Sequence, residues 1–103
     1  MNRELFEQKF NEESSELSTQ FKDFIKESNE QLGEAMRLVI CMEEASELSQ
    51  AISKIYRNKG DRLNLIEEIG DMMICIESLK QLYNITEGEV NKAINVKIHR
   101  GVS

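Results

Sequence analysis

The stretch SNEQLGEAMRLVICMEEASELSQAISKIYRN, from Ser28 to Asn58, decides the fold. Its residues follow the three-to-four-residue spacing of an α-helix, but one face changes character halfway along. That face is first apolar and then charged, with Leu32, Met36, Val39 and Ile40 followed by Glu43, Glu47, Gln50, Lys54 and Arg57. The opposite face stays apolar as far as Tyr56. Because a surface helix is polar along one whole side, this helix is predicted to have partners on several sides, with its charged face turned into a bundle or a cleft.

Helices are also predicted for most of the remaining chain. The 103 residues include no proline and five glycines, which favours long helices, and no segment alternates with the period of a half-buried strand. The predicted helices cover residues 3–26 (with a possible break at 11–16), 28–58, 64–83 and from Thr86 to before Gly101. Since short connections make long helices antiparallel neighbours, the predicted fold is an all-α, four-helix bundle-like single domain over residues 1–103.

Short polar signals set the predicted helix ends. The segment Lys59-Gly60-Asp61 is typical of a helix stop followed by a turn. Three pairs have the spacing of a capping box, in which side chains satisfy free backbone N–H groups: Ser28–Gln31, Asn64–Glu67 and Thr86–Glu89.

The predicted helix over 64–83 carries carboxylates within its apolar pattern. Glu68 lies inside the apolar arc and Asp71 at its border, whereas Glu67 is further round, where solvent is expected. Two helices thus each present a carboxylate pair at i, i+3, namely Glu44 with Glu47 and Glu68 with Asp71. Like charges held together without a counter-charge repel and raise one another's pKa. A contribution to the stability of the fold therefore does not explain why the chain has this cluster.

A divalent cation would resolve this repulsion. Carboxylate oxygens favour hard cations, with Mg²⁺ first and Mn²⁺ also possible. Magnesium usually keeps coordination positions for water and substrate phosphates, so a polyphosphate site is predicted. The alternative is that such pairs arise by chance in glutamate-rich helices and form a solvated face.

The two motifs together resemble a known family. EEASE (Glu43 to Glu47), followed after twenty residues by EIGD (Glu68 to Asp71), resembles the E-E-x-x-E … E-x-x-D signature of the MazG-like all-α nucleoside triphosphate pyrophosphohydrolases. The tail VNKAINVKIHR is also similar, so the resemblance covers about residues 30 to 100 and leaves the N-terminal helix, residues 1–28, outside it.

The resemblance implies a helical bundle that forms homodimers or homotetramers and cleaves nucleoside triphosphates between the α and β phosphates with Mg²⁺. Carried over residue by residue, the metal ligands would be Glu44, Glu47, Glu68 and Asp71. Glu43 would hold or deprotonate the attacking water. Gly70 stands where the family often has alanine.

Basic residues are expected on the phosphate side of such a site. Lys54 and Arg57 share the carboxylate face of the central helix, and Lys97 and Arg100 match the family's basic tail. Each also has an alternative as a surface charge or as a partner of a helix dipole. A base pocket is not readable from the sequence, because Phe21, Phe24, Tyr56 and Tyr83 are each better explained by core packing.

The composition restricts the classes of partner that are expected. A net charge of −6 opposes nucleic-acid binding. The two cysteines, Cys41 and Cys75, are typical of reduced core thiols. No signal peptide or membrane-spanning run is present, so a cytoplasmic protein without a membrane partner is expected. The surface of the central helix, apolar on more than one side, predicts self-association.

Two alternatives to this function stay open. One is a related pyrophosphohydrolase with a different nucleotide, acting on phosphoribosyl-ATP or selective for dUTP or dCTP. The other is a helical interaction protein without catalysis, in which the carboxylates are solvated or bind a basic partner.

Overall fold

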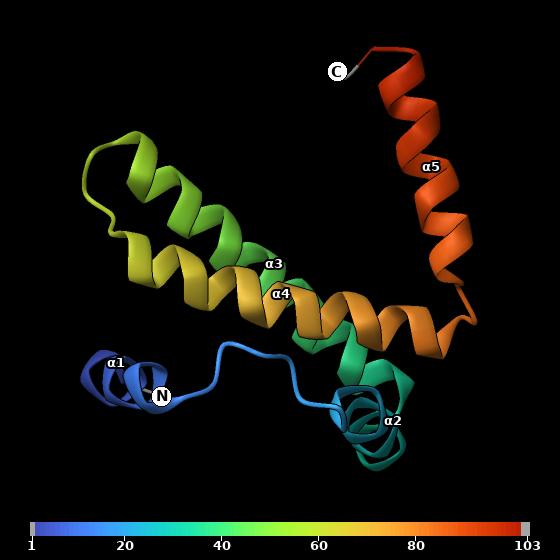
Figure 1. The fold of residues 1–103 in the computed structure, drawn as a ribbon, viewed down its shortest axis with the longest axis horizontal. Helices are drawn as coiled ribbons and strands as arrows, with labels where there is room; N and C mark the ends of the chain where they lie inside the picture. Colours follow the sequence, from blue (N-terminus) through green and yellow to red (C-terminus); the bar gives the residue numbers. More distant parts are fainter. Residues whose placement is uncertain (1, 102–103) are drawn as a thin grey trace.

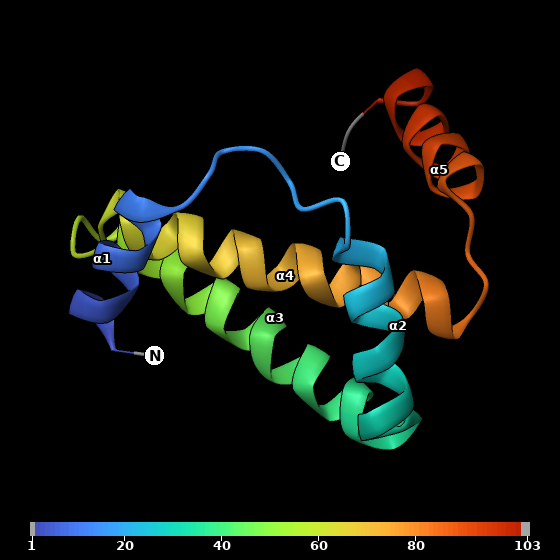
Figure 2. The ribbon, with the colours of Figure 1, turned by 60° about the horizontal axis from the view of Figure 1, so that its bottom comes forward.

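A computed structural model describes residues 2–101, and within them the chain forms five helices and no strand. The helices are α1 (Arg3–Glu12), α2 (Phe21–Leu32), α3 (Glu34–Tyr56), α4 (Arg62–Leu82) and α5 (Glu87–His99). Helices α3 and α4 are long antiparallel neighbours, and α2 packs across both of them (Figures 1 and 2). The all-α prediction is confirmed, whereas the prediction of four helices is wrong by one.

The predicted N-terminal helix is two helices. Residues 13–20 are not helical, so α1 ends at Glu12 and α2 begins at Phe21. The break falls where the sequence offers no large apolar residue between Asn11 and Glu16, and it extends further than predicted. Ser14 and Ser18 hydroxyls accept hydrogen bonds from backbone N–H groups two residues on, which is how serine competes with helix formation.

The predicted helix over 28–58 is also divided, because Gly33 has φ 83° and ψ 162°. This backbone conformation ends α2 and starts α3 in a new direction, and it favours glycine because other residues are strained there. Ser28 is therefore inside α2 and not an N-cap. Its hydroxyl accepts a hydrogen bond from Arg37 Nη2 at 2.5 Å instead.

A short turn makes α3 and α4 antiparallel. The N–H of Lys59 donates to the carbonyl of Lys54 at 2.8 Å, and Asn58 takes φ 57°, which together close the C-terminus of α3. Position 60 requires glycine, because a Cβ there would lie 2.9 Å from the backbone nitrogen of Ile55. The predicted stop at 59–61 is confirmed.

The N-terminal caps of α4 and α5 were predicted with different success. Asp61 caps α4, since its carboxylate accepts from the N–H of Asn64 at 2.8 Å. The predicted capping by Asn64 is therefore wrong by three residues. The Thr86–Glu89 capping box of α5 is confirmed, with the Thr86 hydroxyl accepting from the Glu89 N–H at 3.1 Å.

The core between α2, α3 and α4 is small and partly polar. Its buried apolar residues are Ile25, Cys41, Ala51 and Cys75. Beside them Arg37, which is 5% exposed, donates Nε to Asn29 Oδ1 at 2.8 Å, and Asn29 donates Nδ2 to the carbonyl of Ser78 at 3.1 Å. These bonds fasten α2 to α3 and α4, because a buried polar group left without a partner is expensive.

Both cysteines are buried free thiols, as predicted. The Cys41 thiol donates to the carbonyl of Cys75 at 3.9 Å. Burial raises the pKa of Cys75 to about 12. The thiol therefore stays protonated at neutral pH and acts as a small apolar side chain.

Much apolar surface remains exposed in one chain. The expectation of core packing is wrong for Phe24, Tyr56 and Tyr83, which are 68%, 88% and 46% exposed. No residue of α1 or α5 is fully buried, and α5 stands away from the other helices after the turn at Asn84 (Figure 1). Among residues 2–101, no helix is long and apolar enough to cross a membrane.

Candidate active site

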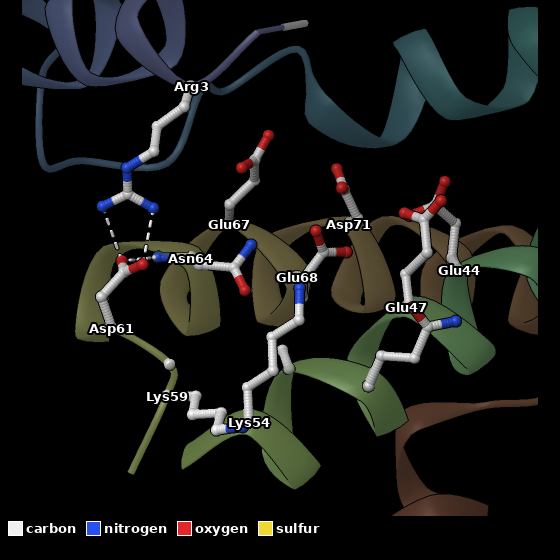
Figure 3. A pocket seen from close by; sticks show the side chains of 13 residues that line it. Arg3, Glu44, Glu47, Lys54, Lys59, Asp61, Asn64, Glu67, Glu68 and Asp71 are labelled. Carbon is white, nitrogen blue, oxygen red and sulfur yellow. Dashed lines mark hydrogen bonds and ion pairs between the residues drawn. The ribbon is translucent and has the colours of Figure 1, made fainter. Parts of the chain in front are cut away.

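Four carboxylates meet where α3 and α4 face each other. Glu44 and Glu47 come from α3, and Glu68 and Asp71 come from α4 (Figure 3). One carboxylate oxygen from each residue lies within 4.8 Å of the others. Three of the side chains are half-buried, and Glu47 is exposed. The two i, i+3 pairs predicted from the sequence therefore form one cluster.

The cluster follows from the packing of the two helices. The distance between packed helices depends on the side chains at the contact, and here the buried side chains are as small as Cys41, Ala51 and Cys75. The short turn at 57–61 sets α3 and α4 antiparallel. Glu44 and Glu47, on either side of the middle of α3, thus face the first half of α4.

The carboxylates disturb one another's ionisation. Burial, followed by the charges of Asp71 and Glu47, raises the pKa of Glu44 to about 7. Burial also raises the pKa of Glu68 and of Asp71, with the Glu47 charge adding to both, while a hydrogen bond to Glu44 opposes the rise at Asp71. The site is short of positive charge at neutral pH.

Two oxygens of the cluster also lack partners. Glu44 Oε2 and Glu68 Oε2 are buried without a hydrogen bond from any described residue. Buried carboxylate oxygens are normally paired with donors or a cation. An oxygen-only set of four carboxylates fits a hard divalent cation such as Mg²⁺, Mn²⁺ or Ca²⁺.

The cluster opens into a polar hollow of about 780 Å³. Charged and amide side chains line most of it, and Lys54 and Lys59 stand at the end of α3 and in the following turn (Figure 3). Arg3 reaches the same hollow from α1 and makes a bidentate ion pair with Asp61, with both N–O distances 2.7 Å. The hollow therefore combines carboxylates with three basic side chains.

The other residues predicted for the site lie outside this hollow in a single chain. Glu43 is exposed on α3, next to Glu44. Arg57 donates Nε to the carbonyl of Ser53 at 3.3 Å. Lys97 and Arg100 are exposed on α5 and at its C-terminal end, away from α3 (Figure 1). Of the predicted basic residues, only Lys54 lines the hollow.

The sequence prediction missed four charged residues of the hollow: Arg3, Lys59, Asp61 and Glu67. Glu67 was placed toward solvent, yet it is half-buried and burial raises its pKa. Its i, i+4 spacing to Asp71 was the available signal. Lys59 is three residues after the end of α3, whereas Arg3 is 58 residues from Asp61 and nothing local points to their contact.

The family model for the MazG nucleotide pyrophosphohydrolase domain matches residues 31–101. The chain belongs to this family. Members of the MazG family are hydrolases that act on acid anhydrides, and the chain is accordingly a nucleotide pyrophosphohydrolase by family. Comparisons with curated proteins and with solved structures gave no match. The match covers α3, α4 and α5 with the four carboxylates, and it leaves out α1 and most of α2.

Proposed function

We propose that this MazG-family chain hydrolyses a nucleoside or deoxynucleoside triphosphate to the monophosphate and pyrophosphate with Mg²⁺. The observation that carries the proposal is the cluster of Glu44, Glu47, Glu68 and Asp71, with two buried oxygens that lack partners. These carboxylates would hold Mg²⁺, with Mn²⁺ as a substitute. The bound ion would polarise the phosphates and lower the pKa of water, and it would leave positions open for both.

The remaining charged residues would position the substrate. Lys54 and Lys59 line the same hollow as the carboxylates, where they would neutralise charge that develops on the pyrophosphate leaving group. Phosphoryl chemistry depends mainly on positioning and on such neutralisation. Arg57, Lys97 and Arg100, also proposed for phosphate binding, would need a different side-chain position or a second copy to reach this hollow.

A carboxylate next to the ligands would take the proton from the attacking water. The family signature assigns this role to Glu43, and we retain that proposal. Glu67 is the matching position on α4 and lines the hollow. Comparing Glu43→Gln with Glu67→Gln separates the two, since the variant that removes the base lowers kcat and leaves Mg²⁺ binding intact.

Product analysis tests the proposed reaction. The protein is incubated with each NTP and dNTP, and with phosphoribosyl-ATP, in the presence of Mg²⁺, and products are separated by ion exchange. Monophosphate and pyrophosphate are expected from at least one nucleotide. Glu47→Gln and Asp71→Asn are expected to lower kcat by about 100-fold or more while circular dichroism shows unchanged helix content. Unchanged turnover in both variants would contradict the proposed metal site.

A further inference from the structure

A second hollow of about 750 Å³ lies between α4 and the N-terminal segment. The chain passes from α1 over α4 to α2 (Figure 2), and the hollow lies beneath it. In contrast to the polar hollow, its lining is mainly apolar and includes Phe6, Phe10 and Phe21. Phe6 and Phe10 are a tilted pair with ring centroids 5.9 Å apart.

The two hollows share a wall. Glu67 and Asp71 line both of them, and Gly70 lines only the apolar one. A Cβ built at Gly70 would have no atom within 4 Å, so the missing side chain leaves open space at this point of α4. The open space at Gly70 therefore borders the wall that Glu67 and Asp71 share with the carboxylate hollow.

We propose that the apolar hollow at Gly70, Phe6 and Phe10 binds the nucleobase of the nucleotide whose phosphates occupy the carboxylate hollow. This inference rests on the proposed function and adds the site that recognises the base. A nucleobase is planar with an apolar face, and it binds by stacking on aromatic rings. The polar hollow has no aromatic side chain among its lining residues, so a stacking surface for the base has to come from the apolar hollow.

The position of α1 supports this assignment. The Arg3–Asp61 ion pair joins α1 to Asp61, the N-cap residue of α4. Phe6 and Phe10 are on α1, the helix that also carries Arg3. All three α1 residues precede the family match, which begins at residue 31. The aromatic residues of the proposed base pocket therefore lie outside the segment that the family model matches, whereas its α4 residues lie inside it.

Filling the space at Gly70 tests the pocket in the full-length protein. Gly70→Ala and Gly70→Leu place a methyl and an isobutyl group over the proposed base site. Gly88→Ala and Gly88→Leu are matched controls, because Gly88 is also a helical glycine, has only Thr86 Oγ1 at 3.8 Å from a built Cβ, and lines neither hollow. Alanine favours a helix over glycine, so Gly70→Ala should keep or raise the melting temperature.

The readout is the dissociation constant of two ligands measured by calorimetry with Mg²⁺. One ligand is a non-hydrolysable analogue of the best NTP, and the other is inorganic tripolyphosphate, which has no base. Gly70→Leu is expected to weaken the analogue by about tenfold or more, in the range of a lost base–aromatic stack, with a smaller effect in Gly70→Ala. Tripolyphosphate should bind all variants within about twofold, since the phosphate contacts are unchanged.

The outcomes distinguish this inference from the proposed function. If the wild type binds neither ligand, the proposed function fails. If it binds both and Gly70→Leu weakens neither, or weakens both equally, the base pocket is wrong while the reaction stands. A change in sedimentation of Gly70→Leu that the Gly88 controls lack, with equal loss of both ligands, would assign the hollow to a second copy of the chain. Phe6→Leu, which keeps an apolar side chain, should weaken only the analogue.

Discussion

The carboxyl group of Glu44 makes the site sensitive to pH. Its pKa is raised from 4.5 to about 7 by burial and by the charges of Asp71 and Glu47. A carboxyl group whose pKa is higher in the folded than in the unfolded protein destabilises the fold as it ionises. The pH dependence is therefore the reverse of that for a salt-bridged carboxylate. The stability that protonated Glu44 gives the folded protein is fully present below about pH 4.5 and is lost as the pH rises to about 7.

This sign gives a prediction for the metal-free protein. Its melting temperature is expected to fall as the pH rises from about 4.5 to about 7, through the cluster's contribution. The increase in melting temperature on adding Mg²⁺ should grow over the same range, because the ion binds the ionised carboxylates of the folded state. Differential scanning fluorimetry with and without Mg²⁺ measures both effects, and Glu44→Gln is the control that should reduce the pH dependence, since Glu67, Glu68 and Asp71 keep raised pKa values. An Mg²⁺-induced shift of equal size at pH 5 and pH 8 would contradict this account.

Among the helices, the junction of α2 and α3 depends on one backbone conformation. Gly33 has φ 83°, a value that residues with a side chain rarely adopt. Gly33→Ala is expected to destabilise the protein by about 1–2 kcal/mol from backbone strain, even though a Cβ there would meet no atom within 4 Å. Urea unfolding followed by circular dichroism measures the change.

The control for that experiment is Gly88→Ala. Gly88 is in the first turn of α5, and its φ is not positive, so alanine should leave stability unchanged or raise it. If the urea concentration at the unfolding midpoint is the same for Gly33→Ala as for the wild type, α2 and α3 do not need this conformation to pack.

The same glycine shows the limit of predicting helices from periodicity. Residues on both sides of Gly33 are helical and keep the helical spacing, so the pattern continues across a point where the chain turns. A positive φ is a property of the backbone and leaves no mark on the neighbouring apolar pattern. Thr86 and Glu89, by contrast, act within one helical turn, which is why their capping box was predictable.

The site was predictable where the interactions are local or follow from a short turn. The i, i+3 carboxylate pairs are set by one helix each, and the turn at 57–61 brings the two helices together. Arg3 could not be placed, because its contact with Asp61 spans 58 residues and depends on how α1 docks. Glu67 was misplaced because the segment near Arg3 covers a face of α4 that the helical pattern leaves open to solvent.

The molecule as a whole exposes many large apolar side chains, and apolar side chains that gather on a surface mark a site of association. On α5, Ile94, Val96 and Ile98 are 49%, 48% and 58% exposed, and α5 stands off from the other helices (Figure 1). Among the elements that contact one another strongly, α2, α3 and α4 form one group without α5. We expect a homodimer or homotetramer in solution, in which α5 packs on another copy. Sedimentation equilibrium measures this, and a monomer at micromolar concentration would contradict it.

Association through α5 would also explain two basic residues that lie outside the hollow. Lys97 and Arg100 are on or next to α5, so an α5 that packs on a second copy can bring them to that copy's carboxylates. Two inactive variants test this: Asp71→Asn, which has an intact α5, and the double variant Lys97→Ala, Arg100→Ala, which has intact carboxylates. Each variant alone should be strongly impaired by the loss of a metal ligand or of phosphate contacts.

Mixed oligomers of the two variants contain a site with wild-type carboxylates from one copy and a wild-type α5 from the other. If α5 acts on the partner's site, equal amounts refolded together should recover about a quarter of the wild-type activity in a dimer, because half of the dimers are mixed and each has one complete site. If α5 acts on its own chain, every site in the mixture lacks either the carboxylate or the basic residues. The mixture would then show only the mean activity of the two variants, and Lys97 and Arg100 would have no role in another copy's site.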